Sequence, residues 1–301
     1  MTREPRPARR RVDGVLLLDK PQGLTSNGAL QAVRRLFAAA KAGHTGTLDP
    51  LATGLLPICL GEATKFAQAL LEADKRYLAE ILLGTRTDSG DAEGNVIARR
   101  PSNVTRNQAE AALACFRGDI TQVPPMYSAL KRDGKPLYAL ARQGISVERA
   151  PRAVRIHSVE LLRFEGERLQ IEVHCSKGTY IRSLADDIGE MLGCGAHLTN
   201  LRRTAIADFS VDHAVTLEAL QQLDGESRDA CLLPVDSLLR GWARVELTAL
   251  QAERFRHGQC LALSGLPSDG VCRVYGDSRF IGIAEYRSDA QLVPLRLIAE
   301  S

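Results

Sequence analysis

The chain has 301 residues, of which 45% are hydrophobic and 25% are charged, and its formal net charge is +3. These values are typical of a soluble globular protein with two domains, or with one large domain and an appendage. No stretch approaches the roughly 18–20 consecutive apolar residues that a membrane-spanning helix needs. The mild basic excess permits nucleic-acid binding without establishing it.

Cysteine usage and the first residues bear on the compartment. The seven cysteines are scattered and form no CxxC pair, which argues against a disulfide framework or a zinc site and favours a reducing cytoplasm. Residues 1–13 hold five arginines and two prolines, and the apolar run at 15–18 is too short for a secretory signal. We therefore expect residues 1–13 to be a basic flexible arm.

The elements predicted for residues 14–245 mix strands and helices. The first part predicts a strand at 15–18, a turn at 20–23, a helix that Thr25 or Ser26 caps, a strand at 77–83 and a loop at 85–95. A helix at 103–116 follows, then an extended segment at 123–131 that ends at the turn 133–134, and a helix at 137–143. A hairpin of strands 154–164 and 169–175 around Gly166 and a helix at 183–192 complete the series. Strict alternation of strand and helix is missing, so an α+β fold is favoured over a doubly wound one.

The pattern changes after residues 234–236. From about residue 246 it predicts one short helix, at 247–256, and short strands at 271–275, 280–286 and 292–298. We expect a main domain at 14–245 and a small β-rich domain at 246–301.

The most informative stretch of the chain is GHTGTLDPLATG at 43–54. It places one carboxylate, Asp49, among hydroxyl side chains and three glycines, which suit a bent backbone or the close approach of a ligand. Pro50 fixes its own φ and pushes Asp49 toward an extended conformation. The carboxylate is a candidate nucleophile, general base or turn cap. A metal site is not expected, because no second carboxylate or histidine stands nearby at ligand spacing.

Two segments carry weaker signals. The acidic loop 88–94 resembles a calcium loop, but Gly90 and Ala92 occupy positions where ligands are needed, so a solvated loop is the better interpretation. The segment 177–184 follows a strand and precedes a helix, where ligands often dock. Its Arg182 has the chemistry to pair with a buried carboxylate, and Tyr180 to pack against a planar ligand. Taken alone, however, the segment is better explained as the start of a helix with a surface arginine.

The arginine pair 202–203 and Tyr77 indicate a function only in combination with the Asp49 loop. Arg202 and Arg203, beside Leu201, suit contacts to phosphates, although a solvated basic patch explains them equally well. Tyr77 begins a strand, and a tyrosine there is usually a core residue unless it faces the Asp49 loop.

Together these segments make the chain resemble the TruB family of tRNA pseudouridine synthases, which isomerise uridine 55 in the TΨC loop. The resemblance covers essentially the whole chain and is carried by residues 19–26, 43–57, 61–65, 75–77, 123–131, 177–184 and 201–204. It implies the pseudouridine synthase fold, a mixed and mainly antiparallel sheet with flanking helices, followed by a small PUA-type RNA-binding domain. One departure concerns residues 207–208, where many members have a glycine and this chain has Ala207 and Asp208.

The resemblance also implies roles for individual residues. Asp49 would be the catalytic nucleophile, Tyr77 would stack on the flipped uracil and assist proton loss from its C5, and Arg182 would pair with Asp49. The residues expected to bind substrate or support the site are His44, Tyr77, Tyr180, Leu201, Lys20, Arg202 and Arg203. The expected partner is the TΨC stem-loop of tRNA, bound by a cytoplasmic monomer that needs no membrane.

Elementary chemistry agrees with this interpretation. The reaction detaches uracil from C1′, rotates it and rejoins it through C5, so no redox cofactor and no activated water are required, and no metal is expected. The residues leave open whether Asp49 attacks C1′, attacks C6 or takes a sugar proton.

Two other functions remain open at this stage. A nucleosidase or retaining glycosidase that uses Asp49 would need a second carboxyl group about 5–5.5 Å away, and the loop offers no obvious partner. A tRNA-binding or folding module would explain the basic arm and the C-terminal domain but not the Asp49 loop.

Overall fold

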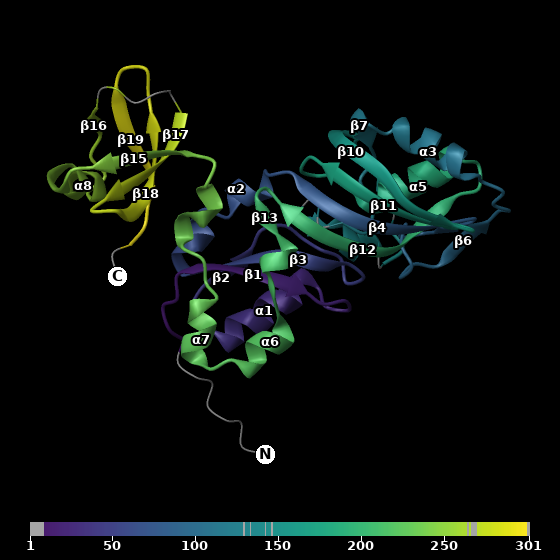
Figure 1. Cartoon of the computed structure of the whole chain (residues 1–301), viewed down its shortest axis with the longest axis horizontal. Helices are drawn as coiled ribbons and strands as arrows, with labels where there is room; N and C mark the ends of the chain where they lie inside the picture. Colours follow the sequence, from purple (N-terminus) through teal and green to yellow (C-terminus); the bar gives the residue numbers. More distant parts are fainter. Residues whose placement is uncertain are drawn as a thin grey trace, which may run out of the picture.

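The computed structural model describes residues 9–299 except 129, 133, 142, 146, 264 and 266–269. Figure 1 shows a large body built on one long, twisted sheet and a smaller β-rich body formed by the C-terminal part of the chain. The α+β prediction is confirmed, because strands and helices of the large body occur without βαβ alternation.

The large sheet has ten strands within the described residues, with the path β14-β1-β3-β12-β4-β11-β10-β7; β2 pairs with β3, and β13 pairs with β12. Their bounds are β1 Gly14–Lys20, β2 Ala42–His44, β3 Thr53–Leu60, β4 Lys75–Leu83, β7 Gly118–Gln122, β10 Arg152–Glu165, β11 Arg168–Cys175, β12 Ala196–Ile206, β13 Phe209–Ser210 and β14 Val215–Thr216. The β1–β14 and β3–β12 pairs are parallel, and the other pairs are antiparallel. The sheet is thus mixed and mainly antiparallel, as predicted.

Two short ribbons, β5 Thr85–Thr87 with β6 Val96–Arg99 and β8 Lys131–Arg132 with β9 Lys135–Pro136, lie outside this sheet. The predicted loop at 85–95 therefore begins with a strand. The Asp133 of the predicted turn lies outside the described residues.

The burial of its side chains explains why β1 lies inside the large body. In β1, Leu16 and Leu18 face one hydrophobic cluster while Val15 and Leu17 face another, so the strand is covered on both sides and reads as a continuous apolar run. The hairpin strand β11 instead buries alternate residues, as its sequence alternation predicts.

Helices cover one face of the sheet and short helical segments cover part of the other. The α-helices are α1 Ser26–Leu36, α2 Gln68–Leu71, α3 Arg106–Ala114, α4 Leu137–Ala141, α5 Ile181–Met191, α6 Leu217–Gln222 and α7 Gly225–Ala230, and the 3₁₀ helices are η1 Gly61–Lys65, η2 Val211–His213 and η3 Val235–Leu239. Thr25 caps α1 by accepting a hydrogen bond from the Gly28 amide, as predicted. Side chains of α1, α3, α5 and α6 all join the larger cluster.

The central strand β12 is missing from the predicted elements. It lies between β3 and β4, and its sequence places Arg202 and Arg203 where a buried strand normally carries apolar residues. Two irregularities in its pairing with β4 also break the alternation of inward and outward side chains. Leu201, Arg202 and Arg203 therefore lie in a central strand rather than in a solvated basic patch.

The C-terminal body has a five-stranded sheet with the order β15-β17-β18-β19-β16 and one helix. Its elements are β15 Ala243–Leu247, α8 Ala249–Arg256, β16 Leu261–Ala262, β17 Gly270–Gly276, β18 Arg279–Tyr286 and β19 Gln291–Leu297. The first of them, β15, pairs in parallel with β17 and starts before residue 246. The expected small β-rich domain is present.

The two bodies touch through both apolar and polar contacts. The rings of Phe66 and Phe280 meet edge to face with centroids 5.4 Å apart. Lys65 donates a hydrogen bond to the Leu297 carbonyl at 2.9 Å, and Glu62 accepts one from the Ala299 amide at 2.8 Å. The end of the chain is thus tied to η1 of the large body.

The predicted flexible arm lies partly outside the described residues, which begin at residue 9. Its last residues are packed: Arg10 forms an ion pair with Asp229 at 2.5 Å, and Val12 is buried. Residues 10–13 are therefore fixed to the large body. Among the described residues, no helix is both long enough and apolar enough to cross a membrane.

Candidate active site

The Asp49 loop is held against the start of α1 by backbone contacts. The buried Ser26 hydroxyl accepts from the Leu48 amide at 2.7 Å and donates to the Leu48 carbonyl at 2.9 Å. The Gly23 amide donates to the Pro50 carbonyl at 2.8 Å. The carboxylate of Asp49 is thereby presented from a fixed backbone rather than a free turn.

Two of the three glycines in the loop have conformations that require glycine. Gly46 has a φ of 97° and Gly54 a φ of 99°, both in the left-handed region. A Cβ on Gly54 would lie 2.3 Å from the Arg203 carbonyl oxygen, because β3 and β12 approach closely there. Gly43 lies in β2 with no such conformation, so of the two expectations for these glycines the bent backbone is found at Gly46 and Gly54.

Asp49 forms an ion pair with Arg182, whose Nη2 lies 3.0 Å from Asp49 Oδ2. The Arg182 side chain is only 5% exposed and comes from the first turn of α5. Its remaining donors reach the carbonyls of Tyr127, at 2.6 Å, and Ser89, at 3.2 Å. The guanidinium is fixed by several partners and orients the carboxylate.

A second carboxylate, Asp91, lies on the other side of Arg182, with its Oδ2 3.6 Å from Arg182 Nε. Asp91 is 3% exposed and accepts a hydrogen bond from the Ser89 hydroxyl at 2.5 Å. The interpretation of 88–94 as a solvated loop is therefore wrong at its centre. Nothing in the local sequence marks Asp91 as buried, because its partner Arg182 is far away in the chain.

A cavity of about 340 Å³ opens beside this ion pair. Its lining comes from the Asp49 loop, β4, β12 and the segment before α5, namely Gly46, Thr47, Leu48, Asp49, Leu71, Lys75, Tyr77, Ser128, Leu130, Ser176, Gly178, Thr179, Tyr180, Ile181, Arg182, Leu201 and Arg203. Asp49, Tyr77, Tyr180, Arg182 and Leu201 therefore line one cavity, although up to 152 residues of sequence separate them. The mixture of one carboxylate, two phenols and apolar walls suits a planar polar ligand.

Arg203 does not have the position of a surface phosphate contact. It is 1% exposed, its Nε donates to the Leu55 carbonyl at 2.7 Å, and its charge interacts with the buried Tyr77 phenol. Arg202 forms a two-pronged ion pair with Asp19, at 3.0 and 2.7 Å. The prediction that Arg203 binds phosphate is wrong, because its side chain is buried. Arg203 instead lines the cavity beside Tyr77.

Lys20 and His44 flank the loop. Lys20 is fully buried and donates to the carbonyls of Pro21 and Leu24, both at 2.8 Å, so it supports the turn beneath the loop. His44 lies on β2, and its Nδ1 is buried without a hydrogen-bond partner among the described residues.

Groups around the cavity shift the pKa of Asp49 in both directions. Burial raises the pKa of Asp49 above its ordinary value and Asp91 adds to this, while Arg182 and Lys20 act in the opposite direction. Burial lowers the pKa of Lys20 to about 8 and that of Lys75 to about 8. Burial also raises the pKa of Tyr77, so its phenol is neutral at neutral pH.

The chain matches three family models in succession. Residues 34–181 match the TruB family pseudouridylate synthase (N terminal domain), residues 182–240 match the tRNA pseudouridylate synthase B C-terminal domain, and residues 243–298 match pseudouridine synthase II TruB, C-terminal. The first two models contain the cavity and the Asp49–Arg182 pair, and the third contains the five-stranded sheet. Fold and site together define a pseudouridine synthase.

Comparison with individual relatives supports the same assignment. The chain is 60% identical over 294 residues to the tRNA pseudouridine synthase B of Aromatoleum aromaticum, covering 98% of this chain and 95% of that one. It is 52% identical over 307 residues to that of Vibrio vulnificus, covering 97% and 98%. The chain belongs to the TruB family of pseudouridylate synthases.

A solved structure extends the likeness to the fold. The crystal structure of a Cbf5-Nop10-Gar1 complex contains a chain that superposes with a TM-score of 0.72 at 25% identity, covering 95% of this chain and 84% of that chain. The predicted pseudouridine synthase fold with a β-rich C-terminal domain is confirmed.

Proposed function

We propose that the protein isomerises uridine 55 in the TΨC loop of tRNA to pseudouridine, with Asp49 as the nucleophile that acts on a flipped-out uridine. The observation that carries this proposal is the Asp49–Arg182 ion pair at 3.0 Å in a cavity that Tyr77 also lines. The relatives are named tRNA pseudouridine synthase B, which supports tRNA as the substrate.

The cavity is suited to a base that has left its stack. Flipping the nucleotide costs a few kcal/mol, and stacking on an aromatic ring such as that of Tyr77 returns about 1–3 kcal/mol. Leu201 and Tyr180 supply further walls. Once the bond between C1′ and N1 breaks, these walls hold the free uracil while it turns to present C5 to C1′.

The reaction is balanced without any added group. The C1′–N1 bond breaks, the C1′–C5 bond forms, and the proton lost from C5 is replaced by one gained at N1. We assign Asp49 the nucleophilic step, Arg182 the orientation of its carboxylate, and Tyr77 stacking on the uracil and assistance to the loss of the C5 proton. Arg203 is proposed as a positioning residue for Tyr77, because its buried guanidinium interacts with the Tyr77 phenol electrostatically.

The rest of the molecule would bind the RNA. We propose that the large body, predicted at 14–245, is the catalytic domain and that the C-terminal body, predicted at 246–301, is a PUA-type RNA-binding domain. His44 and Arg202 are the proposed RNA contacts nearest the site, and Lys20 supports the loop. We further propose that the protein acts in the cytoplasm as a monomer.

Nucleoside analysis of unmodified tRNA incubated with the protein tests this function. Pseudouridine at position 55 and at no other position of the TΨC loop is the expected product. Free uracil would instead identify a nucleosidase, and tRNA binding without any product would identify a binding module. A tRNA with cytidine at position 55 is the matched control and should yield no pseudouridine in this loop.

A further inference from the structure

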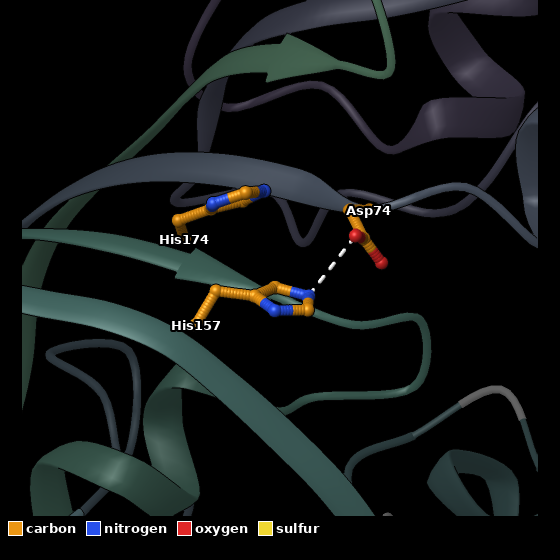
Figure 2. Close-up of side chains that lie close together, drawn as sticks. All are labelled: Asp74, His157 and His174. Atoms are coloured by element: carbon orange, nitrogen blue, oxygen red, sulfur yellow. Dashed lines mark ion pairs between the residues drawn. The ribbon is translucent and has the colours of Figure 1, made fainter. Parts of the chain in front are cut away.

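Three ionisable side chains meet outside the cavity, on the face of the sheet that the large helices leave uncovered. Figure 2 shows Asp74, which precedes β4, beside His157 of β10 and His174 of β11. The Nε2 of His157 lies 3.0 Å from Asp74 Oδ2, and the two imidazole rings have centroids 4.6 Å apart. One ligand atom of each side chain lies within 4.8 Å of the other two.

The pairing of β10 with β11 creates this arrangement. Ile156 pairs with Cys175 and both are buried, so their neighbours His157 and His174 point to the opposite, outward face. The register shifts between Ile156 and Ser158, and the buried Val159 follows, which leaves two outward residues where regular alternation allows one. The bulge thus adds Ser158 to the face that His157 and His174 share.

Accessibility also suits a ligand from solvent. The His157 side chain is 31% exposed and that of Asp74 46% exposed. The cluster holds one carboxylate, and Glu172 adds a second negative charge near His174, where Arg76 supplies a positive one. The two carboxylates favour a cation at the cluster.

We propose that Asp74, His157 and His174 form a binding site for a divalent transition-metal ion of the Zn²⁺ class. Imidazole nitrogens with one carboxylate oxygen are ligands that Zn²⁺, Cu²⁺ and Ni²⁺ accept and that Mg²⁺ does not prefer. Bonds of about 2.0–2.2 Å draw such ligand atoms to within about 3.5 Å of one another. Rotation of exposed side chains achieves this contraction, and the ion replaces the direct contact between His157 and Asp74.

The site lies beside the cavity but not in it. Asp74 immediately precedes Lys75, and His174 stands two residues before Ser176, and both of those neighbours line the cavity. An ion here joins the ends of β4, β10 and β11 and stiffens one wall of the pocket. It takes no part in the isomerisation itself, and its presence does not depend on the proposed function.

This site could not be predicted from the sequence, because its ligands come from three segments separated by 83 and 17 residues. Spacing rules for metal sites detect ligands that stand close together in the chain. The scattered cysteines, the Asp49 loop and the chemistry of the reaction predict no metal; the proposed site departs from that expectation with histidine and carboxylate ligands and takes no part in catalysis.

Calorimetric titration of the full chain with Zn²⁺ tests the proposal. Exposed thiols also bind Zn²⁺, so the titration uses a background in which Cys115, Cys231 and Cys260 are replaced by Ser. We expect one Zn²⁺ per chain, loss of this binding in His157→Gln and in His174→Gln, and weakening by about tenfold or more in Asp74→Asn. The matched control is His257→Gln, an exposed histidine in the C-terminal body, which should bind as the parent does.

A second measurement guards against variants that fail to fold. The absorption spectrum of the parent loaded with Co²⁺ should show weak visible bands and no thiolate charge-transfer band, as expected for nitrogen and oxygen ligands. Zn²⁺ should also raise the melting temperature of the parent and not that of His174→Gln. A parent that binds no Zn²⁺, or whose binding survives both histidine substitutions, would overturn the proposal.

Discussion

Arg182 lies between two carboxylates, with Asp49 Oδ2 3.0 Å from its Nη2 and Asp91 Oδ2 3.6 Å from its Nε. Asp91 is almost fully buried, whereas the Asp49 side chain is 37% exposed and faces the cavity. The same guanidinium therefore neutralises a buried carboxylate and orients the proposed nucleophile. Beside burial, both partners act on the pKa of Asp49, Arg182 lowering it and Asp91 raising it, and this coupling is open to direct test.

Replacing Asp91 should move the acidic limb of the activity profile. The charge of Asp91 raises the pKa of Asp49, and the reaction needs Asp49 ionised, so the Asp91→Asn variant should stay active to lower pH than the parent. Single-turnover rates measured against pH report the limb. The control is Asp186→Asn. Asp186 lies on α5, as Arg182 does, but its ion-pair partner is Arg86 of β5. A limb that stays in place, or moves to higher pH, would disprove the coupling.

Replacing Gly54 should destabilise the fold. A Cβ there would meet the Arg203 carbonyl at 2.3 Å, and the φ of 99° is unfavourable for any other residue. We expect Gly54→Ala to lower the free energy of unfolding by about 3 kcal/mol or more. Gly43→Ala is the matched control, because its nearest neighbour is Thr64 Cγ2 at 3.8 Å. Denaturant unfolding measures both, and equal losses would refute the close-packing argument.

Placing a glycine after β12 should stabilise the protein. Ala207 adopts a φ of 48° in the turn between β12 and β13. Because a left-handed conformation costs a non-glycine residue about 1–2 kcal/mol, Ala207→Gly should raise the free energy of unfolding by about 1 kcal/mol. Thermal unfolding checks this, with Ala214→Gly, at an extended position, expected to be destabilising instead. A lower melting temperature for Ala207→Gly would show that the turn is not strained.

Removing the Tyr77 hydroxyl should separate stacking from proton transfer. Tyr77→Phe keeps the aromatic ring, so the affinity for tRNA should be nearly unchanged. Loss of the phenol should slow isomerisation by about 10²-fold or more. The two are measured by filter binding and by single-turnover pseudouridine formation. Unchanged turnover would exclude Tyr77 from the proton step.

Much of the site could be predicted from the sequence because its strongest signal is local. The string around Asp49 combines glycines, a proline and a carboxylate in a pattern that constrains the backbone by itself. The alternation of β11 and the Thr25 cap of α1 are local in the same sense. These features formed as predicted because neighbouring residues determine them.

The rest depends on contacts between distant residues. Arg203 looks like a phosphate ligand in sequence, yet β3 and β4 bury it between Leu55 and Tyr77. Asp91 looks solvated, yet α5 covers it with Arg182. In both cases a charged residue obscured a buried position, because charge normally indicates solvent and only the partner reveals otherwise.

The role of Asp49 is tested most directly by comparing Asp49→Asn with the parent under single-turnover conditions on unmodified tRNA, with affinity measured in parallel. Asparagine keeps the size of the side chain and a hydrogen bond to Arg182 but removes the nucleophile. We expect pseudouridine formation to fall by about 10⁴-fold or more, with the dissociation constant for tRNA changed by no more than about threefold, since phosphate contacts dominate affinity. Pseudouridine formed by Asp49→Asn at a rate near that of the parent would contradict the account.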